Sequence, residues 1–190
     1  MKTQVFVFGD SIAFGEYDDD MGGWVARLNL ALKKINPDVI VHNLSVSGEL
    51  TDGTLKRFEA DFSRRAEKGI NTIIVFAVGI NDTQRKNLLK TKRNIWELIT
   101  RAKSFTDRVY WVGLTPVDPK KMDAEFDKHY DNDVIDELDG ALWGACWEFA
   151  AYYISCGEHT PETWIDGLHP NAAGHEIIFE QVFKALKDKV

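Results

Sequence analysis

The chain has 190 residues, of which 44% are hydrophobic and 28% are charged, and its formal net charge is -7. This size and composition are typical of a globular protein with one substantial core, so we expect residues 1–190 to form a single domain. The acidic balance argues against nucleic acid as a partner, because that binding needs Lys and Arg to neutralise phosphates.

Apolar runs rich in β-branched and aromatic residues alternate with segments whose apolar residues recur at helical spacing. In chain order these segments predict a strand at 5–8, a helix at 24–35, a strand at 39–41, a helix at 51–68, a strand at 72–78, a helix at 88–105, a strand at 109–114, a helix at 134–149, a strand at 152–156 and a helix from 171 to the end. Such alternation implies an α/β fold with a parallel sheet of about five strands and helices on both faces. The strand at 152–156 abuts the preceding helix, so its boundary between Phe149 and Asp166 stays open. The segment 115–133, rich in Asp and Lys, predicts a surface loop over the active face.

Residues able to do chemistry follow the strands at the edge where parallel sheets bind ligands. They are Gly9-Asp10-Ser11 after the first strand, Asn43 and Gly48 after the second, Gly79-Ile80-Asn81-Asp82 after the third, and Asp166-Gly167-Leu168-His169-Pro170 before the last helix. A serine, an amide, a backbone donor and an Asp/His pair together are the set that acyl transfer requires.

Ser11 is the candidate nucleophile, and a serine hydroxyl needs a base to take its proton. His169 is the best base among the five histidines, because only it has a carboxylate, Asp166, three residues before it on a loop containing glycine. That carboxylate would fix the imidazole tautomer and stabilise the imidazolium. Each feature also has a structural interpretation: Ser11 could cap a helix, and the Asp166–His169 segment could be a surface loop before a helix that starts at Pro170.

Three donors could stabilise the negative charge that develops on the carbonyl oxygen: the backbone N–H groups of Ser11 and Gly48 and the side-chain amide of Asn81. Taken separately, Gly48 could serve only a turn, and Asn81-Asp82 could cap the next helix.

Four sequence blocks, in order, span most of the chain: Gly9-Asp10-Ser11-Ile12-Ala13-Phe14-Gly15, Asn43-Leu44-Ser45-Val46-Ser47-Gly48, Gly79-Ile80-Asn81-Asp82 and Asp166-Gly167-Leu168-His169-Pro170-Asn171. Together they resemble the SGNH hydrolases, also called GDSL esterases and lipases. The resemblance implies a flavodoxin-like three-layer sandwich, a catalytic triad of Ser11, Asp166 and His169, and an oxyanion hole formed by Ser11, Gly48 and Asn81. Ile12 stands where Leu is common, and we expect Asp10 to brace the turn.

Other classes fit the sequence less well. An α/β-hydrolase would need G-x-S-x-G, but Ala13 stands two residues after Ser11, and no nucleotide-binding glycine motif follows the first strand. Asp82, Asp166 and His169 could in principle bind a metal, but their spacing is not diagnostic, so we predict neither metal nor cofactor. The alternative from another class is a non-catalytic module that binds a ligand or carbohydrate on the same fold.

The substrate is expected to be a small-molecule ester with a small or short-chain acyl group, because the turns are short and no large lid is evident. Trp164, two residues before Asp166, could form an aromatic wall near the site, whereas Trp143 and Trp147 are predicted to pack in the core. The sequence leaves the natural substrate and the oligomeric state open.

The N-terminal apolar run, 5–8, is shorter than the core of a secretory signal, and no run approaches the ~18 apolar residues of a membrane span. We therefore expect a cytoplasmic protein without integral membrane association, although a signal already removed would leave no trace. Cys146 and Cys156 are too few for a disulfide framework and lack metal-binding spacing, so we expect two reduced thiols.

Overall fold

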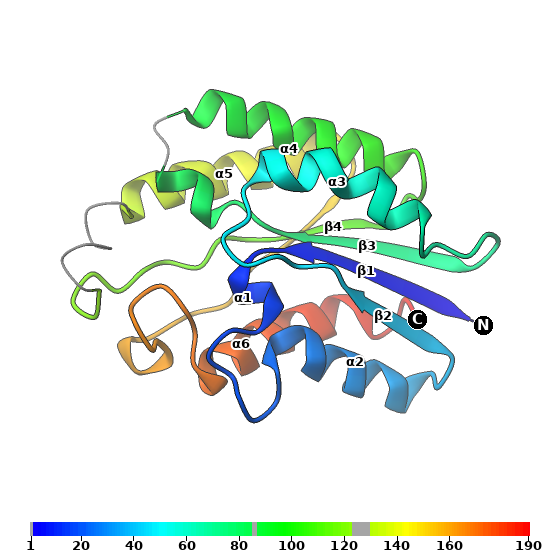
Figure 1. The fold of residues 1–190 in the computed structure, drawn as a ribbon, viewed down its shortest axis with the longest axis horizontal. Helices are drawn as coiled ribbons and strands as arrows, with labels where there is room; N and C mark the ends of the chain where they lie inside the picture. The colour runs from blue at the N-terminus through cyan, green and yellow to red at the C-terminus, as the bar shows by residue number, and fades with distance from the viewer. Residues whose placement is uncertain (1, 85–86, 123–129) are drawn as a thin grey trace.

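The computed structural model describes residues 2–84, 87–122 and 130–190. Its centre is a five-stranded, all-parallel sheet with strand order β2-β1-β3-β4-β5 (Figure 1). The strands are β1 (Thr3–Gly9), β2 (Val39–Asn43), β3 (Asn71–Ala77), β4 (Val109–Val112) and β5 (Tyr152–Ile154). This is the flavodoxin-like order, so the predicted α/β class and parallel sheet are confirmed.

Helices cover both faces of the sheet. They are α1 (Ser11–Phe14), α2 (Gly23–Ile35), α3 (Thr51–Ser63), α4 (Leu88–Lys103), α5 (Asn132–Glu148) and α6 (Ala172–Leu186), with short 3-10 helices η1 (Ile80–Gln84) and η2 (Pro161–Thr163). Figure 1 shows α3, α4 and α5 on one face and α1, α2 and α6 on the other, which makes three layers. The apolar run 5–8 in β1 is fully buried between them, as expected of a strand covered on both sides. One domain over the whole chain stays a prediction.

Helix α3 ends at Ser63, five residues before the predicted end, and the reason is a tertiary contact. The amide side chain of Gln4 in β1 accepts a hydrogen bond from the backbone N–H of Glu67 (3.0 Å) and donates one to its carbonyl oxygen (2.9 Å). These two bonds satisfy backbone groups that a longer helix would have paired internally. The chain therefore leaves the helix before Gly69.

The prediction that Trp143 and Trp147 pack in the core is wrong. Their exposed fractions are 60% and 83%. The buried stripe of α5 consists of Ile135, Leu138, Leu142, Ala145 and Cys146. Residues 143 and 147 are four positions apart, so they share one face of α5. That face lies opposite the buried stripe and points to solvent.

The segment 115–133 is only partly the surface loop that was predicted. Residues 123–129 lie outside the described residues. Of the rest, Val117, Met122 and Tyr130 are buried, and α5 already begins at Asn132. The backbone N–H of Asp118 donates to the carbonyl oxygen of Gly167 (2.8 Å), so this segment packs against the loop that carries Asp166 and His169.

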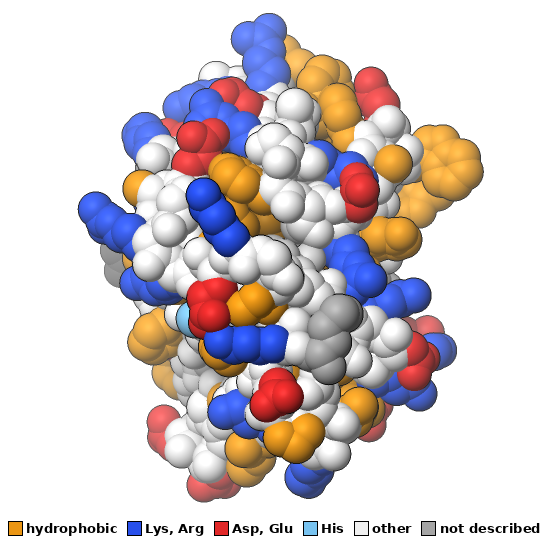
Figure 2. All heavy atoms as spheres, turned by 90° about the vertical axis from the view of Figure 1, so that its right-hand side faces the viewer, with side chains coloured by type: hydrophobic (Ala, Val, Ile, Leu, Met, Phe, Trp, Pro, Cys, Tyr) orange, Lys and Arg blue, Asp and Glu red, His pale blue; other side chains and the backbone are white. Residues whose placement is uncertain are grey.

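The surface carries mixed charge. Figure 2 shows basic and acidic side chains interspersed over the face that lies to the right in Figure 1. Within the described ranges, no helix has the length and apolar character needed to cross a bilayer.

Cys146 and Cys156 are both buried and free, and burial raises the pKa of each thiol to about 12. Thiols of this kind stay protonated at neutral pH, which makes them poor nucleophiles.

Candidate active site

The turn after β1 presents Ser11 at the start of α1. Asp10 caps this helix, because its Oδ1 accepts a hydrogen bond from the backbone N–H of Ile12 (3.1 Å). Asp10 therefore braces the turn, as predicted, and Ser11 is left free of the capping role. Gly15 ends the helix in the left-handed region (φ 103°), where a Cβ would lie 2.3 Å from the carbonyl oxygen of Gly22. Only glycine fits this turn.

Ser11, His169 and Asp166 form a continuous hydrogen-bonded chain. Ser11 Oγ lies 3.0 Å from His169 Nε2, and His169 Nδ1 lies 2.7 Å from Asp166 Oδ2. The other carboxylate oxygen of Asp166 accepts hydrogen bonds from the backbone N–H groups of His169 (2.7 Å) and Leu168 (3.0 Å). The structure thus brings together the three residues predicted to form the triad, although Ser11 is more than 150 positions away from Asp166 and His169 in the sequence.

The carboxyl of Asp166 is set up to stay ionised. Partial burial alone would raise its pKa, but the hydrogen bonds from His169 and Leu168, and the attraction of the imidazole, outweigh that effect. The pKa of Asp166 therefore lies below its ordinary value. An ionised carboxylate on Nδ1 fixes the tautomer in which Nε2 can accept the Ser11 proton.

Asn81 lies in η1 with its side chain held from two sides. Its Nδ2 donates to the carbonyl oxygen of Glu49 (3.1 Å), and its Oδ1 accepts from the hydroxyl of Tyr130 (3.2 Å). Gln84 in turn donates to the Tyr130 hydroxyl. The Glu49 contact leaves one N–H of the amide available and joins Asn81 to the residue after Gly48.

Gly48 has φ 71°, and a Cβ added there would meet nothing within 4 Å. The backbone conformation, and not lack of space, therefore favours glycine at this position. Asn43 connects this loop to the nucleophile turn, because its Nδ2 donates to the carbonyl oxygen of Ala13 (3.0 Å) while its Oδ1 accepts from the N–H of Ser45 (3.1 Å). The second sequence block thus packs directly against the first.

Asp82 serves the scaffold. Its carboxylate accepts hydrogen bonds from the backbone N–H (2.9 Å) and hydroxyl (2.6 Å) of Thr51 and from the hydroxyl of Thr91 (3.1 Å). Asp82 therefore binds the first N–H of α3 from a distant part of the chain. The N-cap of α4 is Asn87, so the interpretation of Asn81-Asp82 as the cap of the next helix is wrong. Within the described part of the chain, no three His, Cys, Asp or Glu residues are grouped as metal ligands.

Trp164 is buried, and its ring stacks on that of His159 with the centroids 4.8 Å apart. Its backbone carbonyl oxygen accepts a hydrogen bond from Lys121 Nζ (2.8 Å). Trp164 therefore packs within the loop before Asp166, and the suggested aromatic wall does not present an open ring face.

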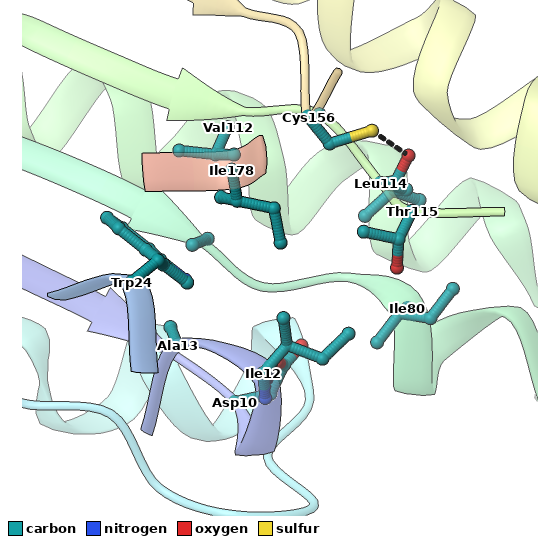
Figure 3. Close-up of a pocket in the computed structure, with 12 residues that line it drawn as sticks. Asp10, Ile12, Ala13, Trp24, Ile80, Val112, Leu114, Thr115, Cys156 and Ile178 are labelled. Atoms are coloured by element: carbon teal, nitrogen blue, oxygen red, sulfur yellow. Dashed lines mark hydrogen bonds between the residues drawn. The ribbon is translucent and has the colours of Figure 1, made fainter. Parts of the chain in front are cut away.

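A small cavity of about 30 Å³ lies behind the nucleophile turn (Figure 3). Asp10 and Ile12, the neighbours of Ser11, face Ile80 and Thr115 across it, while Ser11 itself is not among its lining residues. These surroundings are mostly apolar, and burial raises the pKa of Asp10 to about 7, with repulsion from Asp82 adding to the effect.

Two residues that no sequence pattern indicated also contact the candidate triad. Glu16 Oε2 lies 3.6 Å from His169 Nε2, and the ring of Tyr17 lies 5.1 Å from the imidazole, centroid to centroid. Neither residue directly follows a strand, and neither lies at a spacing that marks a motif, so only the folded structure reveals them.

Comparison with known proteins identifies the family. A model of the GDSL-like lipase/acylhydrolase family matches residues 7–177. The chain belongs to this family. A GDSL esterase/lipase of Arabidopsis thaliana is 26% identical over 220 residues, covering 100% of this chain and 88% of that protein. The resemblance drawn from the four sequence blocks is confirmed.

Solved structures with the same fold include members of this GDSL family. The crystal structure of TesA matches with a TM-score of 0.79 and 22% identity, covering 98% of this chain and 99% of that one. A lipolytic G-D-S-L protein of Veillonella parvula matches with a TM-score of 0.77 and 19% identity over 96% and 97% of the two chains. Axe2, an acetylxylan esterase of Geobacillus stearothermophilus, matches with a TM-score of 0.74 and 16% identity over 95% and 92%. At these sequence identities, the similarity to solved structures establishes the fold alone.

Proposed function

We propose that this GDSL hydrolase is a serine esterase that cleaves carboxylic esters with small or short-chain acyl groups through an acyl-enzyme on Ser11. The observation that carries the proposal is the hydrogen-bonded chain from Ser11 Oγ to His169 Nε2 (3.0 Å) and from His169 Nδ1 to Asp166 Oδ2 (2.7 Å). This is the arrangement by which a base activates a serine hydroxyl.

In the acylation step, Ser11 Oγ attacks the carbonyl carbon while its proton passes to His169 Nε2. The carbonyl oxygen becomes an anion and is bound by the N–H groups of Ser11 and Gly48 and by the free N–H of the Asn81 amide. The bond to the alcohol oxygen then breaks, and that oxygen takes the proton from Nε2. Asp166 stabilises the imidazolium between these two transfers.

In the deacylation step, water replaces the alcohol. His169 takes a proton from the water, and the water oxygen attacks the acyl carbon of the Ser11 ester. Collapse of the second tetrahedral intermediate releases the carboxylic acid and returns the proton to Ser11. No metal or cofactor is required by these steps.

A short acyl group is the first to test, since acetyl is the group that the acetylxylan esterase among the fold relatives is named for. Hydrolysis of p-nitrophenyl esters of graded chain length by the wild type and by Ser11→Ala tests the proposal. We expect turnover by the wild type alone, with kcat/KM highest for chains of about two to six carbons. Activity that rises steadily beyond about eight carbons would contradict the short-chain assignment, and equal activity of Ser11→Ala would contradict the mechanism.

A further inference from the structure

Glu16 places a carboxylate beside the Ser11–His169 pair. Its Oε2 lies 3.6 Å from His169 Nε2, the nitrogen that faces Ser11, and its Oε1 accepts a hydrogen bond from the hydroxyl of Ser47. The Glu16 side chain is 33% exposed, so it remains open to a ligand. Ser47 directly precedes Gly48, so Glu16 spans the gap between the base and the loop that carries a predicted oxyanion donor.

The backbone around Glu16 is firmly held. Its carbonyl oxygen accepts a hydrogen bond from Nε2 of the fully buried His175 (3.0 Å). The next residue, Tyr17, adopts φ 64°, an uncommon and costly conformation for a bulky side chain. Asp18 then forms a buried ion pair with Arg27. These contacts hold the backbone that carries the carboxylate, and the strained residue, Tyr17, contacts the His169 ring.

The position of Glu16 relates it to one particular part of a substrate. In the function proposed above, on which this inference rests, Nε2 delivers its proton to the departing alcohol oxygen, which must then lie about 3 Å from Nε2. A carboxylate oxygen 3.6 Å from the same nitrogen therefore lies beside the alcohol portion of the ester. In the same proposal the carbonyl oxygen is held by the N–H groups of Ser11 and Gly48 and by the side-chain amide of Asn81.

We propose that Glu16 is a specificity-determining residue that selects esters whose alcohol carries an electropositive group, a positive charge or a hydroxyl donor, within about two carbons of the ester oxygen. A carboxylate attracts such groups and repels an anionic alcohol. Oε1 already accepts from Ser47, which leaves Oε2 to receive the substrate.

The test compares two pairs of acetate esters of matched shape. Acetylcholine is compared with its uncharged carbon analogue 3,3-dimethylbutyl acetate, and 2-hydroxyethyl acetate with propyl acetate. At low ionic strength we expect the wild type to favour the charged ester about tenfold in kcat/KM and the hydroxyl ester about threefold, as one partly screened charge contact and one hydrogen bond allow. The charge preference should shrink at high salt.

Glu16→Gln keeps the shape of the side chain and removes its charge, so the charged-to-neutral ratio should fall to about one. Glu137→Gln is the matched control, because Glu137 lies on α5, is 59% exposed and pairs with Lys92 instead. This control should keep the wild-type ratio. If Glu16→Gln is poorly folded, the wild-type ratios still test the proposal.

Two results would overturn the role of Glu16 while leaving the esterase function intact: wild-type ratios near one for both pairs, or an unchanged charge ratio in Glu16→Gln with every ester slowed equally. The second result would mean that Glu16 only positions His169. Failure of the wild type to cleave any ester, together with no covalent labelling of Ser11, would instead refute the esterase function and this inference with it.

Discussion

Replacing Asp10 by Asn should remove a pH-dependent penalty on the folded state. Asp10 is only 2% exposed, and burial raises its pKa from 3.8 to about 7. Between about pH 4 and pH 7 the folded protein therefore keeps a proton on this carboxyl that the unfolded chain has released. Since the folded state binds more protons in this window, Asp10 makes the protein less stable as pH rises through it.

The magnitude follows from the two pKa values. A difference of about three pH units, at about 1.4 kcal/mol each, corresponds to about 4 kcal/mol of lost free energy of unfolding once Asp10 is ionised. Asn has the same shape and can still accept the hydrogen bond from the N–H of Ile12. The free energy of unfolding of Asp10→Asn, minus that of the wild type, should therefore increase by up to about 4 kcal/mol between pH 4 and pH 8.

Urea unfolding followed by circular dichroism at five pH values measures this difference. Asp107→Asn is the control for replacing a carboxylate by an amide at the surface, because the Asp107 side chain is 97% exposed. Burying the new amide can change the free energy of unfolding of Asp10→Asn by a constant amount, but this does not change how the difference from the wild type varies with pH. A difference that stays constant from pH 4 to pH 8 would refute the reasoning.

Further substitutions test the site and the turn. Asp166→Asn should lower kcat by about 10³- to 10⁴-fold with a much smaller change in KM, because the ring then loses its ionised partner; a loss below tenfold in steady-state kinetics would contradict this role. Asn81→Ala should lower kcat by about 10²- to 10³-fold, and Tyr130→Phe by less, because Tyr130 only orients Asn81; equal effects would argue against that division. Gly15→Ala should reduce the free energy of unfolding by more than about 2 kcal/mol, since φ is 103° and the Cβ would lie 2.3 Å from a backbone oxygen. Urea denaturation checks the last prediction, and a loss under about 0.5 kcal/mol would contradict it.

The elements with strong periodicity were predictable. The run 5–8 is apolar at every position because the strand is covered on both faces, and a short run of this kind is typical of such a strand. Parallel topology followed from alternating strands and helices, and it placed Ser11, Asn81 and His169 at the same edge. Errors arose where tertiary contacts or the choice of face decided the outcome. The end of α3 depends on Gln4, more than 60 positions earlier, and helical spacing alone did not show which face of α5 carries Trp143 and Trp147.

The additional site residues were not predictable for a different reason. Glu16 and Tyr17 follow the first block by one and two positions, but nothing in their types says that the chain turns back over His169. That turn depends on the left-handed Gly15 and on the buried pair of Asp18 and Arg27, and Arg27 also pairs with Glu176 of α6. These are contacts between distant segments, which the local sequence does not indicate. Tyr130 reaches Asn81 from an irregular segment with no periodic signal.

Covalent labelling of Ser11 tests the central claim most directly. The wild type and Ser11→Ala would each be treated with a fluorophosphonate at neutral pH, and intact-protein mass spectrometry would count the adducts. We expect a single adduct on the wild type, mapped to the peptide containing Ser11, and none on the variant. A folded wild type that stays unlabelled, or an adduct that persists on Ser11→Ala, would contradict it.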